Sequence, residues 1–150
     1  MNDFTCKGLL SSAPGFDALV LRLVAGAIFI AHGAQKLFGW FGGGGLEGTG
    51  QWMASIGLEP GYLMALLAGG AEFFGGLLLV VGLLTRPAAL ACAFTMLVAT
   101  VVVHLDNGFF ARSGGYEFSL ALLAMSVALV LRGAGSWSVD EQLAERCDNR

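Results

Sequence analysis

The amino-acid sequence predicts an all-α membrane protein, a four-helix bundle with a short interfacial helix in the first outer loop. The first observation is composition, because 56% of the 150 residues are hydrophobic and only 13% are charged, about half the charge of an average soluble domain. The second is a set of four apolar stretches, each close to the ~20 residues that a helix needs to cross a bilayer. The third is that runs such as residues 77–81 lack the alternation of a barrel strand, which leaves helices as the spanning elements.

The four predicted spans cover residues 16–38, 62–84, 87–105 and 116–131. The fourth is the shortest, so we expect it to tilt little or to thin the bilayer locally. An apolar stretch near the N-terminus can also be a cleaved leader. We expect the first span to be retained, because it carries an arginine, a histidine, a glutamine and a lysine.

Two shorter helices are predicted outside the membrane. In the first outer loop, residues 50–56 have the pattern of a helix that lies in the interface. After the last span, Ser138 and Glu141 have the spacing of a capping box, which predicts a polar tail helix at about residues 139–146. Residues 1–150 are expected to form a single domain, because the length leaves no room for a second module.

Composition and motifs also exclude several classes of function. The net charge is −3 and the pI is about 5.2, so a basic surface for nucleic acid is not expected. Cys6, Cys92 and Cys147 are far apart and form no C-x-x-C motif, which argues against a disulfide framework and dithiol chemistry. The glycine run at residues 42–45 is not followed by Gly-Lys-Ser/Thr, so it is not a phosphate-binding loop.

Lysine and arginine residues set the expected orientation in the membrane. Lys36 and Arg112 lie on one side of the predicted bundle. Five basic residues lie on the other side: Lys7, Arg86, Arg132, Arg146 and Arg150. This distribution predicts a multi-pass protein with both termini in the cytoplasm.

Small residues recur along the second and third spans and are expected to let helix backbones approach closely. They are Ala71, Gly75 and Gly82 on the second span, and Ala91, Thr95 and Ala99 on the third.

Six polar side chains within the predicted spans need an account, because ionisable groups are costly in hydrocarbon. They are Arg22, His32, Gln35, Lys36, Glu72 and His104. Three of them, His32, Gln35 and Lys36, are at positions i, i+3 and i+4 and therefore share one helix face. Glu72 falls near the middle of the second span, and His104 falls at the outer end of the third. Apart from Arg22, the set is therefore expected to converge on the outer half of the bundle.

Glu72 is the deepest acid and requires a partner. His32 or Lys36 could reach it from the outer side, and Arg22 could reach it from the inner third of the first span. Arg22 could instead extend its side chain to the inner headgroups. The sequence leaves these alternatives open.

The residue types favour proton relay or the binding of a polar headgroup at this cluster. Two histidines on facing helices can hold a haem, but a lone pair without a further signature disfavours haem, and a dedicated metal site is not expected. Nucleophilic catalysis is not indicated either, because no serine or cysteine has a base at motif spacing.

Five motifs are shared with a known family: LRL at 21–23, HGAQKL at 32–37, GAEFFGG at 70–76, LLTR at 83–86 and G-x-x-S-x-D at 135–140. Through them the chain resembles the DoxX family of small bacterial membrane proteins over roughly residues 16–141. The resemblance implies a four-helix protein of the bacterial cytoplasmic membrane. It carries over Arg22, His32, Lys36 and Glu72 by position, with no catalytic role attached to them.

What the resemblance implies about activity is a link to redox systems. The family takes its name from a small subunit associated with a terminal quinol oxidase and with thiosulfate:quinone oxidoreduction. This chain has no second domain resembling the partner subunit of the thiosulfate enzyme. Any oxidoreductase role would therefore be that of a non-autonomous subunit, with a partner polypeptide.

The leading hypothesis is a small membrane subunit whose polar cluster binds a quinone, with Glu72 relaying protons and the tail lying along Phe73 and Phe74. The alternative is a non-catalytic scaffold or assembly protein, in which the polar residues only hold helices together. The expected partners are the lipid bilayer and either another polypeptide or further copies of this chain. A small transporter is disfavoured, because the chain is short, lacks inverted repeats and has no polar track through its inner half.

Overall fold

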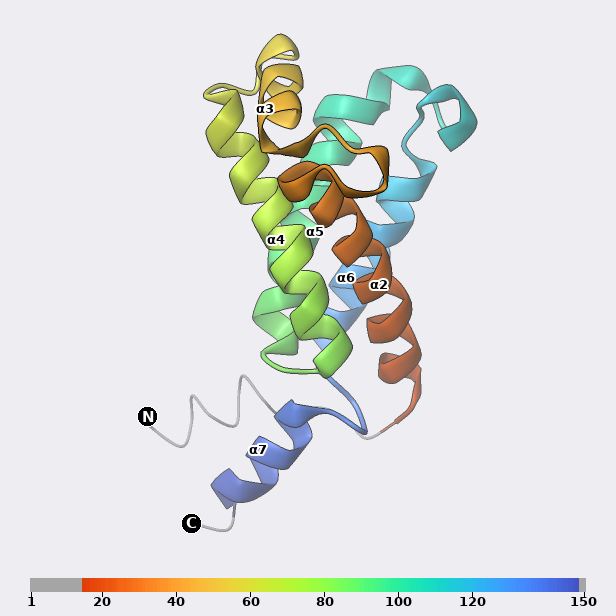
Figure 1. The fold of residues 1–150 in the computed structure, drawn as a ribbon. Coiled ribbons are helices and arrows are strands. Elements are labelled where there is room, and N and C mark those ends of the chain that lie inside the picture. Colours follow the sequence, from red (N-terminus) through yellow and green to blue (C-terminus); the bar gives the residue numbers. More distant parts are fainter. Residues whose placement is uncertain (1–14, 149–150) are drawn as a thin grey trace.

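Four long helices lie alongside one another in the computed structural model, which describes residues 15–148 (Figure 1). They are α2 (Asp17–Phe38), α4 (Gly61–Val81), α5 (Thr85–Val98) and α6 (Glu117–Arg132). A short helix, α3 (Gly45–Ser55), lies at one end of the bundle, and α7 (Val139–Asp148) extends from the other. We refer to these as the α3 end and the α7 end. Cys6, Lys7 and Arg150 lie outside the described residues.

The predicted fold class, an all-α membrane bundle with a short interfacial helix, is confirmed. Within the described residues, three helices are long and apolar enough to cross a membrane: Asp17–Phe38, Gly61–Val81 and Thr85–Asn107. The last of these is α5 with its continuation through a π-helical segment, Ala99–His104, and a 3-10 turn, Leu105–Asn107. The fourth, α6, has 16 residues and is about 24 Å long at 1.5 Å per residue, so it is the shortest of the four, as expected.

Three predicted boundaries differ from the structure. The second span ends at Val81 rather than at residue 84, because Gly82 adopts a left-handed conformation (φ 72°) and its N–H bonds to the carbonyl of Leu78. The third begins at Thr85, ahead of Pro87, since the first turn of a helix has no internal partner for its N–H groups. The interfacial helix begins at Gly45 rather than at residue 50.

Helices α2 and α4 pack closely through glycines. A Cβ on Gly33 of α2 would lie 2.7 Å from Cα of Phe73, and a Cβ on Gly76 of α4 would lie 2.8 Å from the carbonyl oxygen of Gly26. Real Cβ atoms do not approach backbone this closely, so these positions require glycine. The missing side chains let the two backbones touch, which is how helices associate in lipid.

The tail folds back onto the turn between α4 and α5. Asp140, which is 1% exposed, accepts hydrogen bonds from the backbone N–H groups of Leu84 (2.7 Å) and Thr85 (2.9 Å). Its own N–H donates to the carbonyl of Gly82 at 2.9 Å. A carboxylate at this place satisfies the free N–H groups that begin α5 and complements the helix dipole. One half of the predicted capping box forms, because Ser138 accepts from the N–H of Glu141 at 3.1 Å. The carboxylate of Glu141 accepts from the N–H of Trp137 at 2.9 Å instead of from that of Ser138.

Replacing Asp140 with alanine should lower the free energy of unfolding by about 1–2 kcal/mol, the cost of removing a helix cap. The thermal unfolding midpoint of detergent-purified protein measures this. Glu145→Ala is the matched control, because Glu145 is an exposed carboxylate on the same helix. Equal midpoints for the two variants would contradict the capping role.

Candidate functional site

A cavity of about 790 Å³ opens inside the half of the bundle next to the α3 end. Helices α2, α4, α5 and α6 form its walls, and residues of α3 cover it. Its lining includes five of the six side chains that the sequence singled out: His32, Gln35, Lys36, Glu72 and His104. The structure thus brings together residues from α2, α4 and the far end of α5.

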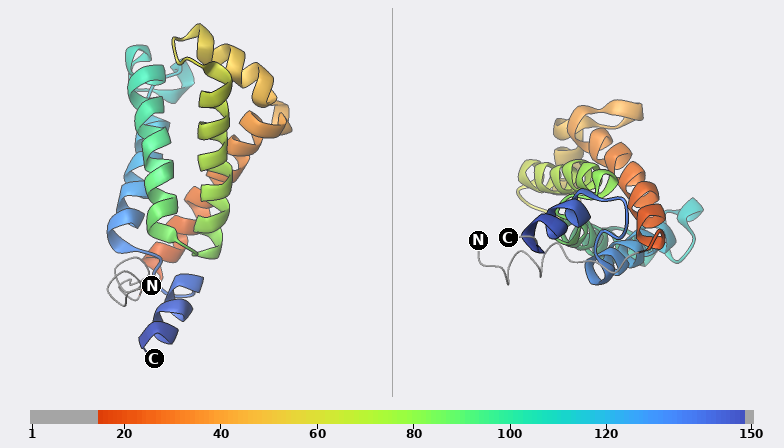
Figure 2. Two further views of the ribbon diagram at one scale, coloured as in Figure 1. Left: turned by 90° about the vertical axis from the view of Figure 1, so that its left-hand side faces the viewer. Right: turned by 90° about the horizontal axis from the view of Figure 1, so that it is seen from below.

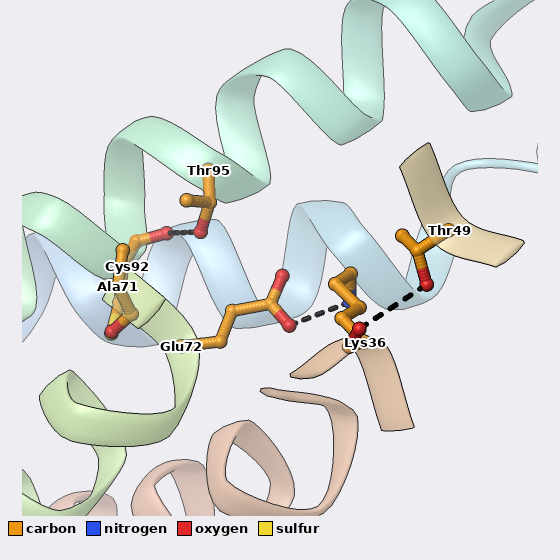
Figure 3. A network of polar contacts seen from close by, with 6 residues as sticks. All are labelled: Lys36, Thr49, Ala71, Glu72, Cys92 and Thr95. Atoms are coloured by element: carbon orange, nitrogen blue, oxygen red, sulfur yellow. Dashed lines mark hydrogen bonds and ion pairs between the residues drawn. The ribbon is translucent and has the colours of Figure 1, made fainter. Parts of the chain in front are cut away.

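An ion pair between α2 and α4 is part of the cavity lining, and Figure 3 shows its two side chains. Lys36 Nζ donates to Glu72 Oε2 at 2.6 Å, with side chains that are 24% and 2% exposed respectively. Glu72 is too enclosed to be hydrated, so the ammonium group takes the place of water. Because the two charges cancel, the pair adds no net charge to the site.

Arg22, expected as one possible partner of Glu72, is not part of the cavity. It is fully buried near the α7 end, where its guanidinium donates to the carbonyls of Leu79 and Val80 of α4 at 3.3 and 3.4 Å. It also donates to the tail carbonyls of Ser136 and Trp137 at 3.3 and 3.1 Å. Both expectations for Arg22, the pair with Glu72 and the extension to the headgroups, are therefore wrong. Lys36 is nearer to Glu72, and the end of α4 offers carbonyls that lack helical partners.

His32 and Gln35 present polar atoms to the cavity from the same face of α2 as Lys36. The His32 ring lies against Phe118 of α6, with centroids 5.8 Å apart. Neither of its nitrogens has a hydrogen-bond partner among the described residues, so both are available to a ligand. The Gln35 amide nitrogen makes one long bond, 3.4 Å, to the carbonyl of Phe41, and its amide oxygen remains open to the site.

His104 has a defined orientation at the end of the π-helical segment. Its Nδ1 lies 2.7 Å from the carbonyl oxygen of Gly114. A carbonyl only accepts hydrogen bonds, so Nδ1 carries a proton, and in the neutral ring Nε2 is an acceptor. His104 can therefore accept a hydrogen bond from a ligand.

Three hydroxyl residues in the lining were not predicted as site residues: Thr49, Thr95 and Ser119. Their hydroxyls donate to the backbone carbonyls of Lys36, Cys92 and Tyr116, the first two drawn in Figure 3. Each oxygen keeps a lone pair for a ligand. Threonine and serine are common in membrane helices as packing residues, so their types alone give little signal. Within residues 15–148, no group of three or more His, Cys, Asp and Glu side chains is placed to hold a metal ion.

Small residues on α5 have a different role from the expected one. Ala91 and Thr95 of α5, and Ala99 at the start of the π-helical segment, line the cavity, and Ala99 also packs against the core. Gly75 of α4, in contrast, does pack closely, since a Cβ there would lie 2.8 Å from Cys92 Sγ. Small side chains permit close approach but also leave space, and here the stripe on α5 leaves space.

The remaining walls are mainly apolar, and two large side chains of the lining also face outward. Leu67 of α4 is 58% exposed and Phe94 of α5 is 66% exposed. Phe73 and Phe74, expected to accompany a ligand tail, do not line the cavity. Phe73 packs instead between Phe38 and Phe74, with ring centroids 5.1 and 5.4 Å away.

Comparison with known proteins identifies relatives across most of the chain. The sequence pattern of the DoxX family matches residues 18–105. CatD of Bacillus subtilis is 37% identical over 122 residues, covering 81% of this chain and 83% of that protein. The inner membrane protein YqjF of Escherichia coli is 30% identical over 128 residues, covering 85% and 92%, respectively. The inner membrane protein YphA of Escherichia coli is 35% identical over 86 residues, 57% of each chain. No solved structure matches the chain.

Proposed function

This chain belongs to the DoxX family of inner-membrane proteins, and on that premise we propose that it is a small quinone-binding subunit of a membrane redox system. The observation that carries the proposal is the cavity, in which mainly apolar walls surround an internally neutralised polar cluster. One relative bears the name "Putative oxidoreductase CatD", which supports a redox context.

The chemistry of the cavity suits the ring of a quinone. A quinone carbonyl accepts hydrogen bonds and a quinol hydroxyl donates them, so a site for both needs donors and acceptors. Lys36 offers a donor, and Nε2 of His104 and the amide oxygen of Gln35 offer acceptors. His32 can do either, depending on its tautomer. Because Glu72 cancels the charge of Lys36, the site favours a neutral headgroup over an anionic one.

The proposed role is binding and proton exchange, with electrons supplied from elsewhere. Reduction of a quinone to a quinol takes up two electrons and two protons. Side chains of the cavity can hold or pass protons, whereas the electrons must come from a redox-active partner polypeptide. The subunit would therefore position the quinone for that partner.

Replacing Glu72 with glutamine should weaken binding of an alkyl-tailed benzoquinone about tenfold or more, which corresponds to ~1.4 kcal/mol. The substitution leaves Lys36 as an uncompensated charge in the cavity. His32→Ala should also weaken binding, because a ring that lines the cavity is lost. Binding to purified protein can be followed by quenching of Trp52 fluorescence, since Trp52 lines the cavity as well.

Glu47→Gln is the matched control, because Glu47 is an exposed carboxylate on α3 outside the cavity lining. Equal quinone affinity for wild type, Glu72→Gln and His32→Ala would contradict the assignment of the quinone site.

The ion pair also links α2 to α4, which supports a second candidate function, that of a non-catalytic scaffold. In that case Glu72→Gln lowers the unfolding midpoint or the yield of a complex and leaves quinone affinity unchanged.

The charge distribution supports an orientation with both termini in the cytoplasm. Arg86, Arg132 and Arg146 belong to the α7 end, and Lys36 and Arg112 belong to the α3 end. Under the positive-inside rule the α7 end would be cytoplasmic. The proposed quinone site would then lie in the half of the membrane away from the cytoplasm.

A further inference from the structure

The cavity is open to the side between α4 and α5. Its lining includes a row of residues on each of these helices that are exposed or half-buried: Met64, Leu67 and Ala68 on α4, and Phe94, Thr95 and Val98 on α5. Residues that line the cavity and are also exposed form the rim of an opening. In the left view of Figure 2, α4 and α5 lie side by side in front, and α2 crosses behind them.

The opening lies at the depth of the hydrocarbon. Leu67 is six residues from the start of α4, about 9 Å along the helix, and Phe94 is nine residues from the start of α5, about 14 Å. The two helices run in opposite directions, so these distances are measured from opposite ends of the bundle. The hydrocarbon core is about 30 Å thick, and the rim therefore faces lipid chains.

Residue size explains why the helices are apart there. Toward the α7 end, Gly75 brings α4 against Cys92 and Ala88 of α5. Closer to the α3 end, the lining residues on these two helices include the small side chains of Ala68 and Thr95. On the opposite side of the cavity, the His32 ring contacts Phe118, which links α2 to α6.

We propose that the ligand reaches the cavity sideways from the bilayer between α4 and α5, and that its apolar tail stays in this opening against Leu67 and Phe94. The inference rests on the proposed function and makes it more specific: the ligand is a neutral ring with an apolar tail, dissolved in the membrane. Glu72, paired with Lys36, is almost fully buried, whereas the apolar Leu67 and Phe94 are largely exposed, so ring and tail each have a matching surface.

The test compares an alkyl-tailed benzoquinone with the same ring lacking the tail, using full-length protein in lipid nanodiscs. Wild type should bind the tailed ring more tightly, and Ala68→Trp, which places a large side chain next to Leu67 in the cavity lining, should reduce that preference about tenfold or more. Ala124→Trp is the matched control, because Ala124 is an exposed alanine on α6 outside the lining. Since both variants sit in the same lipid, partition of the tailed ring into the membrane cancels between them.

A second variant tests the opening without adding a larger side chain to the bundle. Phe94→Ala removes an exposed ring from the rim and should weaken binding of the tailed ring several-fold while leaving the tailless ring unaffected. A tail preference that survives in both variants overturns the lateral opening, while the quinone site itself stands. If wild type binds neither compound, the proposed function fails and the opening fails with it.

Discussion

Replacing Arg22 with alanine should lower the free energy of unfolding by about 3 kcal/mol or more. The side chain is fully buried, and its guanidinium donates to four backbone carbonyls from two parts of the chain. A buried acceptor that loses its partner costs about 1–3 kcal/mol, and the removed side chain leaves a void. The carbonyl of Leu79 also accepts from the N–H of Gly82 at 3.2 Å, so the cost falls on the other three carbonyls. The bonds are long, between 3.1 and 3.4 Å, so each contributes near the low end of its range.

Thermal or denaturant unfolding in detergent measures the loss, and two further variants interpret it. Leu23→Ala truncates an exposed residue next to Arg22 on α2 and should cost little. Arg22→Lys keeps the charge but replaces the planar guanidinium group by a single ammonium group, which cannot reach the carbonyls of both α4 and the tail. It should therefore recover less than half of the stability that Arg22→Ala loses. If Arg22→Ala unfolds at the same midpoint as Leu23→Ala, the contacts of Arg22 with the tail do not contribute to stability.

This arginine also shows what residue types cannot reveal. Its partners are backbone carbonyls of Leu79, Val80, Ser136 and Trp137, and a carbonyl is present at every position, so no sequence pattern marks them. The contact depends on the tail returning to the end of α4, which is a property of the tertiary structure. The position of Arg22 in a predicted span therefore indicated that the charge has a hydrogen-bond partner, but it did not identify which residues provide it.

The polar cluster was more predictable because helix periodicity carries it. The spacing of His32, Gln35 and Lys36 fixes them on one face, and the depth of Glu72 in its span brings it level with that face. The same reasoning did not find Thr49, because it lies on α3, whose start is determined by packing. A Cβ on Gly61 would overlap the backbone of α3 at Gly50, so this helix is held by tertiary contact despite its glycine-rich, weakly helical sequence.

Packing volume was the least predictable property. The alanine stripe on α5 and the glycines of α2 both consist of small residues at helical spacing, yet the first borders a cavity and the second lies in a close contact. A small residue is compatible with both outcomes, and the larger side chains around it decide between them. Gly26 and Gly33 of α2 are among the glycines at which an added Cβ would lie closer than 3.0 Å to the backbone of another segment.

Replacing Gly33 with alanine should lower the free energy of unfolding by about 2–3 kcal/mol, in the range for overpacking a close contact. The added methyl would lie 2.7 Å from Cα and 2.8 Å from Cβ of Phe73, so α2 and α4 must move apart. Lys36 is one turn further along α2, and Glu72 precedes Phe73. The same movement should therefore disturb the 2.6 Å ion pair and weaken quinone binding as well.

The matched control is the same substitution at Gly70 of α4, where an added Cβ meets nothing within 4 Å. With no steric cost, alanine should stabilise the helix by about 0.5–1 kcal/mol, since it restricts the unfolded chain more than glycine does. The two glycine-to-alanine variants are thus expected to shift the unfolding midpoint in opposite directions. A rise at both positions would mean that α2 and α4 adapt freely, and the glycine contact would then not be what aligns Lys36 with Glu72.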